Sequence, residues 1–208
     1  MNKFLKLFTH EIYIVAMLGI ISVTTAWAGV QSSLHGGASD EAYSVYQLDL
    51  SESNNMWITS EVKYRADLTV WKDKQVRLLI DGVSNDDIYA DIQTSNGSYE
   101  FAVYATPCLI AQPQSYLPDC APYMDELYVP QAEVWERASE SLVVSETEGG
   151  RSDRLQVLTA LFAISLFMLG ISSVIKRKEL LLPLVVLATA LWVFGCAVLL
   201  SIPNISFM

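Results

Sequence analysis

The sequence predicts a mainly α-helical integral membrane protein with three transmembrane helices and a helical extracytoplasmic domain. The first observation is that 52% of the 208 residues are hydrophobic, a high share for a soluble domain, and that the excess lies in three uncharged runs. The second is that the chain between the first two runs is acidic, with twenty Asp or Glu against six Lys or Arg in residues 31–150. An acidic segment of this size between apolar runs indicates a domain that is carried across the membrane.

The three uncharged runs cover residues 12–30, 155–175 and 180–202. An α-helix rises 1.5 Å per residue, so each run is long enough to cross a hydrocarbon core of about 30 Å. We therefore expect one transmembrane helix in each run.

The first run has a second interpretation, as a signal peptide. Two lysines precede its apolar core, and the small residues Ala26 and Ala28 occupy the positions that a signal peptidase requires before Gly29. However, the core is longer than that of a usual signal peptide, and Glu11 adjoins it. A retained anchor is the favoured prediction, and the domain that follows is exported in either case.

The connection between the second and third runs fixes the predicted topology. It is so short that the two helices must form an antiparallel hairpin, and it contains Lys176, Arg177 and Lys178. Short loops rich in Lys and Arg stay in the cytoplasm. The predicted order is a cytoplasmic N-terminus (1–11), a transmembrane helix (12–30), an extracytoplasmic domain (31–150), a second helix (155–175), a cytoplasmic turn (176–179), a third helix (180–202) and an extracytoplasmic tail (203–208).

The first half of the exported domain carries a heptad pattern after a predicted Gly- and Ser-rich linker at Gln31–Ala38. The apolar members of one heptad position are Tyr43, Leu50, Trp57, Tyr64, Trp71 and Leu78. The companion position is polar beyond its first member: Tyr46, Ser53, Ser60, Asp67 and Lys74. Because only half of a coiled-coil seam is apolar, we expect this helix to pack on a short second helix.

A small β-rich domain around residues 57–105 is the alternative to helices in this part of the chain. Residues 62–70 alternate between apolar and polar side chains, and Asn96-Gly97 is a hairpin signal. Against this, Ile88, Ile92, Tyr99 and Val103 recur at helical spacing. The helical interpretation is therefore favoured.

A further helix is predicted after a Pro-rich stretch. Pro130 suits the first turn of a helix, and Trp135, Ala138 and Leu142 continue a helical period. Glu148-Gly149-Gly150 predicts a hinge or break before the second span.

The C-terminal part of the chain also carries a resemblance. "AEVWERASE" and the following "SDRLQVLTALFAISLFMLGISSVIKRKELLLPLVVLATALWVFGCAVLLSIP" are similar to the end of small bacterial inner-membrane proteins that form families of unknown function. Such proteins pair an N-terminal anchor with a helical periplasmic segment and a closing two-helix hairpin. The resemblance implies this architecture and a bacterial inner membrane, and it implies no activity and no functional residue.

Composition argues against several classes of activity. Transporters keep charged or readily charged groups inside the bilayer, and the three runs contain no Asp, Glu, Lys, Arg or His. The acidic segment Asp81–Asp91 does not fit a calcium-binding loop because Gly82 occupies its second position. His35 has no partner at metal-ligand spacing, and no nucleophile elbow or Gly-rich phosphate loop occurs. We expect no enzyme, no metal and no cofactor.

Cys108 and Cys120 lie in the exported segment and are predicted to form a disulfide, which stabilises a short loop by about 3 kcal/mol in an oxidising compartment. The alternative is two unpaired thiols. Cys196 lies in the third run and is expected to act as a small apolar residue.

The exported domain is dense in Tyr and Trp, which are enriched in protein interfaces and also fill cores. Tyr116, Tyr123 and Tyr128 lie in a Pro-rich segment and are the predicted partner-binding residues. The acidic charge excludes nucleic acid as a partner. The sequence thus predicts an interaction or scaffold subunit in contact with the lipid bilayer and with a protein partner or itself; the alternative is a homo-oligomeric channel or pore-forming effector.

Overall fold

The computed structural model of the protein describes residues 11–81, 97–105, 120–175 and 177–205. Three long helices, α2 (Glu11–Asp81), α5 (Ala121–Val174) and α6 (Lys178–Leu199), and one π-helical turn, η1 (Phe101–Ala105), account for most of this part of the chain. No strand occurs in the described residues. The helical prediction is confirmed there, and the β-rich alternative is wrong for the described part of residues 57–105.

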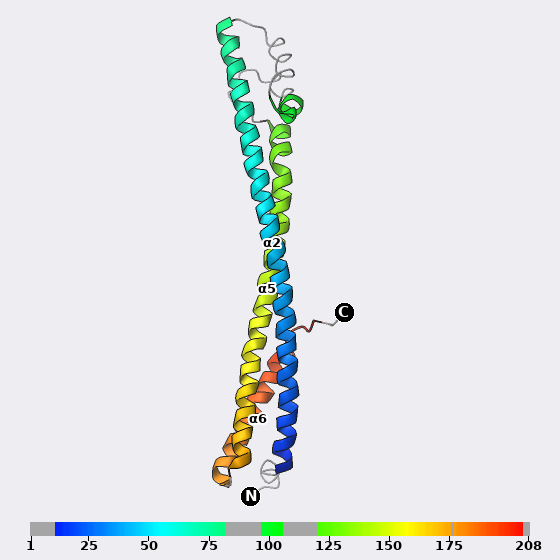
Figure 1. The fold of residues 1–208 in the computed structure, drawn as a ribbon, viewed down its shortest axis with the longest axis vertical. Coiled ribbons are helices and arrows are strands. Elements are labelled where there is room, and N and C mark those ends of the chain that lie inside the picture. The colour runs from blue at the N-terminus through cyan, green and yellow to red at the C-terminus, as the bar shows by residue number, and fades with distance from the viewer. Residues whose placement is uncertain (1–10, 82–96, 106–119, 176, 206–208) are drawn as a thin grey trace. The chain divides into compact units, whose positions relative to one another are not determined.

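The chain forms two compact units. The span unit comprises Met1–Tyr43 and Leu142–Met208, and the acidic unit comprises Ser44–Ser141. α2 and α5 contribute residues to both units, and within each unit they lie side by side in antiparallel order (Figure 1). α6 belongs to the span unit.

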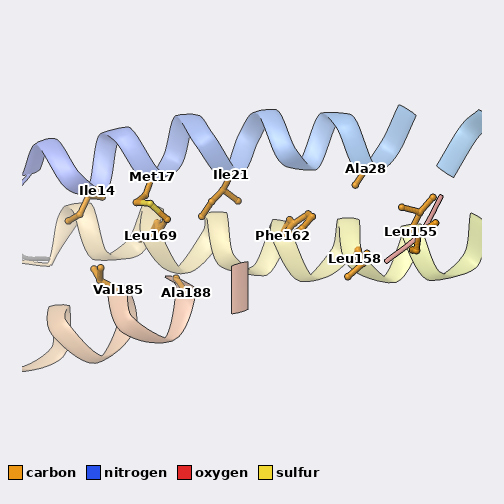
Figure 2. Close-up of a cluster of buried hydrophobic side chains, with 11 residues drawn as sticks. Ile14, Met17, Ile21, Ala28, Leu155, Leu158, Phe162, Leu169, Val185 and Ala188 are labelled. Carbon is orange, nitrogen blue, oxygen red and sulfur yellow. The ribbon is translucent and has the colours of Figure 1, made fainter. Parts of the chain in front are cut away.

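The span unit contains the three helical segments that are long and apolar enough to cross a membrane. Their shared core contains Ile21 of α2, Phe162 of α5 and Val185 of α6, all fully buried (Figure 2). Other faces of the same helices expose large apolar side chains, including Val23 at 70% and Phe167 at 69%. Apolar side chains that face outward are compatible with lipid contact.

The predicted linker at Gln31–Ala38 is wrong, because these residues are helical within α2, and the predicted break at Glu148–Gly150 is wrong, because α5 continues through it. The glycines permit a close approach of the two helices. A Cβ atom at Gly36 would lie 3.3 Å from the Ser152 Oγ, and one at Gly149 would lie 3.1 Å from the Ser39 Oγ. Tertiary packing therefore offsets the helix propensity cost of glycine, about 1 kcal/mol per residue.

Pro130 lies inside α5 and not in its first turn, so that prediction is also wrong. A proline within a helix removes one backbone hydrogen bond and disturbs the preceding turn. In this turn the Ser60 Oγ donates a hydrogen bond to the Leu127 carbonyl oxygen at 2.5 Å. α2 thus supplies a hydrogen-bond donor to α5 next to the backbone hydrogen bond that Pro130 removes.

The polar heptad position of α2, and not the aromatic one, is the more uniformly buried in the acidic unit. Its buried members are Ser53, Ser60, Asp67 and Lys74. At the aromatic position Trp71 is fully buried, whereas Trp57 is 49% exposed. The expected half-apolar seam is therefore a seam of small and polar side chains, with an apolar core of Trp71, Phe101, Ala105, Tyr123 and Leu127 at one end.

Candidate functional site

A groove on the acidic unit is the candidate site for a partner. It has a volume of about 550 Å³ and is lined from α2 and α5, with one residue from the turn before η1. Apolar side chains line it at Leu48, Met56, Leu127 and Pro130, and the remaining lining residues are Ser51, Glu52, Asn55, Thr59, Ser60, Lys63, Glu100 and Glu126. The α2 residues recur every three or four positions because they share one helical face.

An ion pair between Lys63 and Glu100 lies in the groove. The Lys63 Nζ donates to the Glu100 Oε1 at 2.6 Å, and this hydrogen bond is the main reason that the pKa of Glu100 is held below its usual value. Glu52 and Glu126 are exposed and form no ion pair within the described part of the chain. The groove therefore combines an apolar lining with two exposed carboxylates.

A buried carboxylate on α2 positions Glu100. The two carboxylate oxygens of Asp67 accept hydrogen bonds from the Ser98 N–H at 2.8 Å, the Ser98 hydroxyl at 2.6 Å and the Tyr123 hydroxyl at 2.8 Å. The Ser98 Oγ in turn accepts a hydrogen bond from the Phe101 N–H at 3.1 Å, as the N-cap residue before a helix commonly does. Asp67 thereby ties the start of the turn that contains Glu100 to α2.

Tyr123 is held in its neutral form by the same contacts. Its burial, followed by its hydrogen bond to Asp67, raises the pKa of the hydroxyl well above its usual value. The ring lies edge-on to Phe101, with centroids 5.7 Å apart, and stacks with Tyr64 at 6.5 Å. Tyr123 is therefore a core residue of the acidic unit.

An ionic cluster of His35, Glu148 and Arg151 lies in the span unit, next to the ends of the apolar runs. The imidazole of His35 is 1% exposed, and its Nδ1 contacts the Glu148 carboxylate, which also accepts a hydrogen bond from the Arg151 Nη1. The Nε2 of His35 lies 3.0 Å from the Pro203 carbonyl oxygen. His35 is thus held between α5 and the segment that follows α6.

These contacts determine how many protons the cluster holds. The Pro203 carbonyl can only accept, so the Nε2 of His35 carries a hydrogen. The Nδ1 faces the Glu148 carboxyl group. If neither group carried a proton there, the lone pairs of the nitrogen and the oxygen would face and repel each other. One proton must therefore lie between His35 and Glu148, either on the imidazole or on the carboxyl group.

Gln31 fixes the same C-terminal segment by a second route. Its Nε2 donates to the Ile205 carbonyl oxygen at 3.3 Å, and its Oε1 accepts from the Ile205 N–H at 3.0 Å. Together with His35 it attaches residues 203–205 to α2 at two positions.

Of the three predicted partner-binding tyrosines, the structure describes Tyr123 and Tyr128. Tyr116 lies outside the described residues, and Tyr123 is fully buried. Tyr128 is partly buried, and its hydroxyl donates to the Glu61 carboxylate at 3.3 Å. The hypothesis that this cluster contacts a partner stays a prediction.

The predicted disulfide involves Cys108, which lies outside the described residues. The Cys120 thiol contacts the carbonyl oxygens of Tyr104 and Ala105 at 3.6 and 3.8 Å. Pairing of Cys108 with Cys120 stays a prediction.

Of the basic turn, Lys176 lies outside the described residues. Arg177 is exposed and directly precedes α6, and Lys178 is the first residue of that helix.

Sequence reasoning missed both the groove and the ionic cluster. The sequence pattern predicts only a hinge at Glu148, and it offers His35 only as a metal ligand without a partner. A signal was available, because Gln31 and His35 continue the helical spacing of Ile14, Ile21 and Ala28, the buried face of the first span. Among the described residues, no three His, Cys, Asp or Glu side chains are grouped so that they could hold a metal ion.

The fold defines a helical protein with three candidate membrane spans and an acidic helical unit. No protein family, curated protein or solved structure matches the chain at a significant level.

Proposed function

We propose that the protein is an integral membrane interaction subunit that presents its acidic unit to a protein partner. In this proposal it resides in the inner membrane of a bacterium, with three transmembrane helices and the acidic unit outside the cytoplasm. The bilayer surrounds the apolar faces of the span unit, and the partner contacts the acidic unit. A self-assembled pore is the competing outcome of the test below.

The proposed topology rests on the distribution of charge. Lys176, Arg177 and Lys178 lie in the short connection between the second and third spans, where basic residues favour the cytoplasmic side. The acidic unit then lies on the opposite side, because one span separates it from that connection.

Cysteine labelling tests the topology. In a variant whose native cysteines are replaced by serine, we expect Ser139→Cys to react with a membrane-impermeant maleimide in intact spheroplasts and Glu179→Cys to react only after lysis. Both positions are exposed, so accessibility within the fold does not distinguish them. The reverse pattern would show that the orientation is wrong.

The single observation that carries the interaction function is the groove of the acidic unit. Leu48 is 71% exposed although it lies in a polar part of the chain, and it lines the groove together with Met56 and Pro130. Large apolar side chains on a water-exposed surface cost solvation free energy and commonly mark interaction sites.

Native purification tests the proposal. The tagged full-length protein is extracted in a mild detergent, and its native mass and every copurifying chain are determined. We expect a discrete mass that includes another polypeptide. A mass that is a whole multiple of 23.1 kDa, together with conductance in a planar bilayer, would instead support the pore.

A further inference from the structure

We infer that the groove of the acidic unit binds a basic amphipathic helix of the partner protein. This inference rests on the proposed interaction function and names the chemistry of the partner. The occupant is a helix with one apolar face and with Lys or Arg side chains along the edges of that face.

The shape of the groove favours a helix over a small molecule. The α2 residues that line it extend from Leu48 to Lys63, which corresponds to about 22 Å of helix at 1.5 Å per residue. α5 lines the other side with Glu126, Leu127 and Pro130. A helix can lie between two such helices and insert apolar side chains at every third or fourth position.

The apolar lining provides the area for this contact. Leu48 and Met56 are two turns apart on α2, and Leu127 and Pro130 are three residues apart on α5. Leu127 is already buried, so apolar side chains of an incoming helix would remove Leu48, Met56 and Pro130 from water, which is favourable by about 25 cal/mol per Å² of apolar surface.

The charges of the groove select a basic partner. Among the described residues of the lining Lys63 is the only basic one, and Glu100 already pairs with it. Glu52 and Glu126 are exposed at the groove and have no ionic partner in the described residues. Lys or Arg side chains on the edges of a bound helix would neutralise them, whereas acidic side chains would be repelled.

Charge also argues against a second copy of the acidic unit in the groove. Residues 44–141 contain sixteen Asp or Glu and six Lys or Arg. Two such units would repel each other over a Debye length of about 8 Å at physiological salt. The same field would attract a basic helix and accelerate its association.

Peptide binding to the full-length protein in uncharged detergent micelles tests the inference. The probe is a labelled amphipathic helical peptide of 18 residues, about 27 Å at 1.5 Å per residue, with Leu along one face and Lys along its edges. A matched peptide carries Glu in place of Lys. We expect fluorescence anisotropy to show saturable binding of the Lys peptide alone.

Two matched double variants locate the binding. Glu52→Lys with Glu126→Lys reverses both groove carboxylates, whereas Asp73→Lys with Glu136→Lys makes the same change of net charge at exposed positions outside the groove. We expect the groove variant to weaken binding at least about tenfold and the control variant at most about twofold. Helicity by circular dichroism checks that both variants are folded.

A third variant, Leu48→Ser, tests the apolar contact without any change of charge. We expect it to weaken binding about tenfold as well. If both charge-reversal variants lost the same amount of affinity for the Lys peptide, the attraction would be diffuse and the inference would be overturned. Equal binding of the Glu peptide, or no binding of the Lys peptide, would also overturn it. A native dimer that the groove variant alone dissolves would place a second copy in the groove.

The native purification separates this inference from the function on which it rests. If the wild-type protein copurifies with a partner and the groove variant retains that partner, the interaction function stands and the groove is not the contact.

Discussion

Ser32 and Ser152 donate hydrogen bonds to each other's backbone. The Ser32 Oγ donates to the Ser152 carbonyl oxygen at 3.1 Å, and the Ser152 Oγ donates to the Ser32 carbonyl oxygen at 3.0 Å. Seven residues further along α2, the Ser39 Oγ donates to the Ser145 carbonyl oxygen at 2.8 Å. Small hydroxyl side chains therefore hold α2 and α5 close together in the span unit, as small residues do in membrane helix pairs.

A larger side chain at this contact should separate the helices. We expect Ser32→Leu to lower the free energy of unfolding by about 1–3 kcal/mol, because Ser32 is buried and an added side chain overpacks the interface. Ser33→Leu is the matched control at an exposed neighbouring position. Unfolding by SDS titration in mixed micelles, followed by circular dichroism, measures both; equal midpoints would contradict the close contact.

Gly195 provides a second test of close packing, between α5 and α6. A Cβ atom there would collide with the ring of the buried Phe162, whose Cζ would lie at 3.0 Å and whose Cε1 would lie nearer. We expect Gly195→Ala to destabilise the protein by about 1–3 kcal/mol. Gly170→Ala meets no atom within 4 Å and should be neutral or stabilising, since alanine favours the helix.

The same titration gives the readout for the glycine variants. Replacement of Phe162 by Leu together with Gly195→Ala should be less destabilising than the sum of the two single changes, because the ring that collides is absent. An additive result would show that the helices do not meet at this glycine.

Glu148 should stabilise the span unit mainly through its contact with His35. Removing the carboxyl group leaves the Nδ1 of the buried His35 without its hydrogen-bond partner, so we expect Glu148→Ala to destabilise the protein by about 1–3 kcal/mol. In Glu148→Gln, the amide can donate to the Nδ1 while the Nε2 still donates to Pro203. That variant should therefore be much closer to wild type.

The unfolding midpoints of the two Glu148 variants provide the measurement. Protease cleavage after Pro203 adds a local readout, because the C-terminal segment is attached through His35 and should be more accessible in Glu148→Ala. If the alanine and glutamine variants are equally stable, the proton between His35 and Glu148 is not a feature of the folded protein.

The Tyr123 hydroxyl should stabilise the acidic unit. We expect Tyr123→Phe to cost about 1.5–3 kcal/mol, because it removes a hydrogen bond to the buried carboxylate of Asp67. Tyr128→Phe is the control, since its hydroxyl donates to the partly exposed Glu61 at 3.3 Å, and it should change stability by less than about 0.5 kcal/mol. Arg65, and not Tyr128, is the main reason that the pKa of Glu61 is lowered.

The raised pKa of Tyr123 also predicts a pH dependence. The unfolded chain releases this proton near pH 10, whereas the folded chain retains it. The contribution to stability is therefore complete below about pH 10 and is lost as the pH rises further. Phenolate absorbance of folded wild type and Tyr123→Phe should be the same just above pH 10; a smaller signal in the variant would show that Tyr123 ionises with the other tyrosines.

The disulfide between Cys108 and Cys120 can be tested by alkylation under denaturing conditions. We expect one alkylated cysteine, Cys196, without reductant, and all three cysteines of the chain after reduction. Intact mass counts the labels. Three labels without reductant would favour the alternative of unpaired thiols.

The sequence by itself determined the helical class and the three candidate membrane spans. Long uncharged runs leave no other way to satisfy the backbone in a bilayer, so composition is sufficient for this prediction. Heptad spacing favoured a helix from Tyr43 onward, and α2 contains it; the continuity of α2 through the predicted linker at Gln31–Ala38 was not predicted, and the alternation in residues 62–70 left a strand as the alternative.

Tertiary structure decided which face of α2 is buried and which polar residues meet. Ser53 and Ser60 interrupt the apolar heptad pattern, yet they are buried because their hydroxyls donate hydrogen bonds to backbone carbonyl oxygens of α5. The sequence predicts a linker at Gly36 and a break at Gly149, yet both glycines lie within helices and allow the serine side chains opposite them to approach. His35 and Glu148 are 113 residues apart in the chain; local patterns describe neighbours along one helix, and only the packing of two helices brings such residues together.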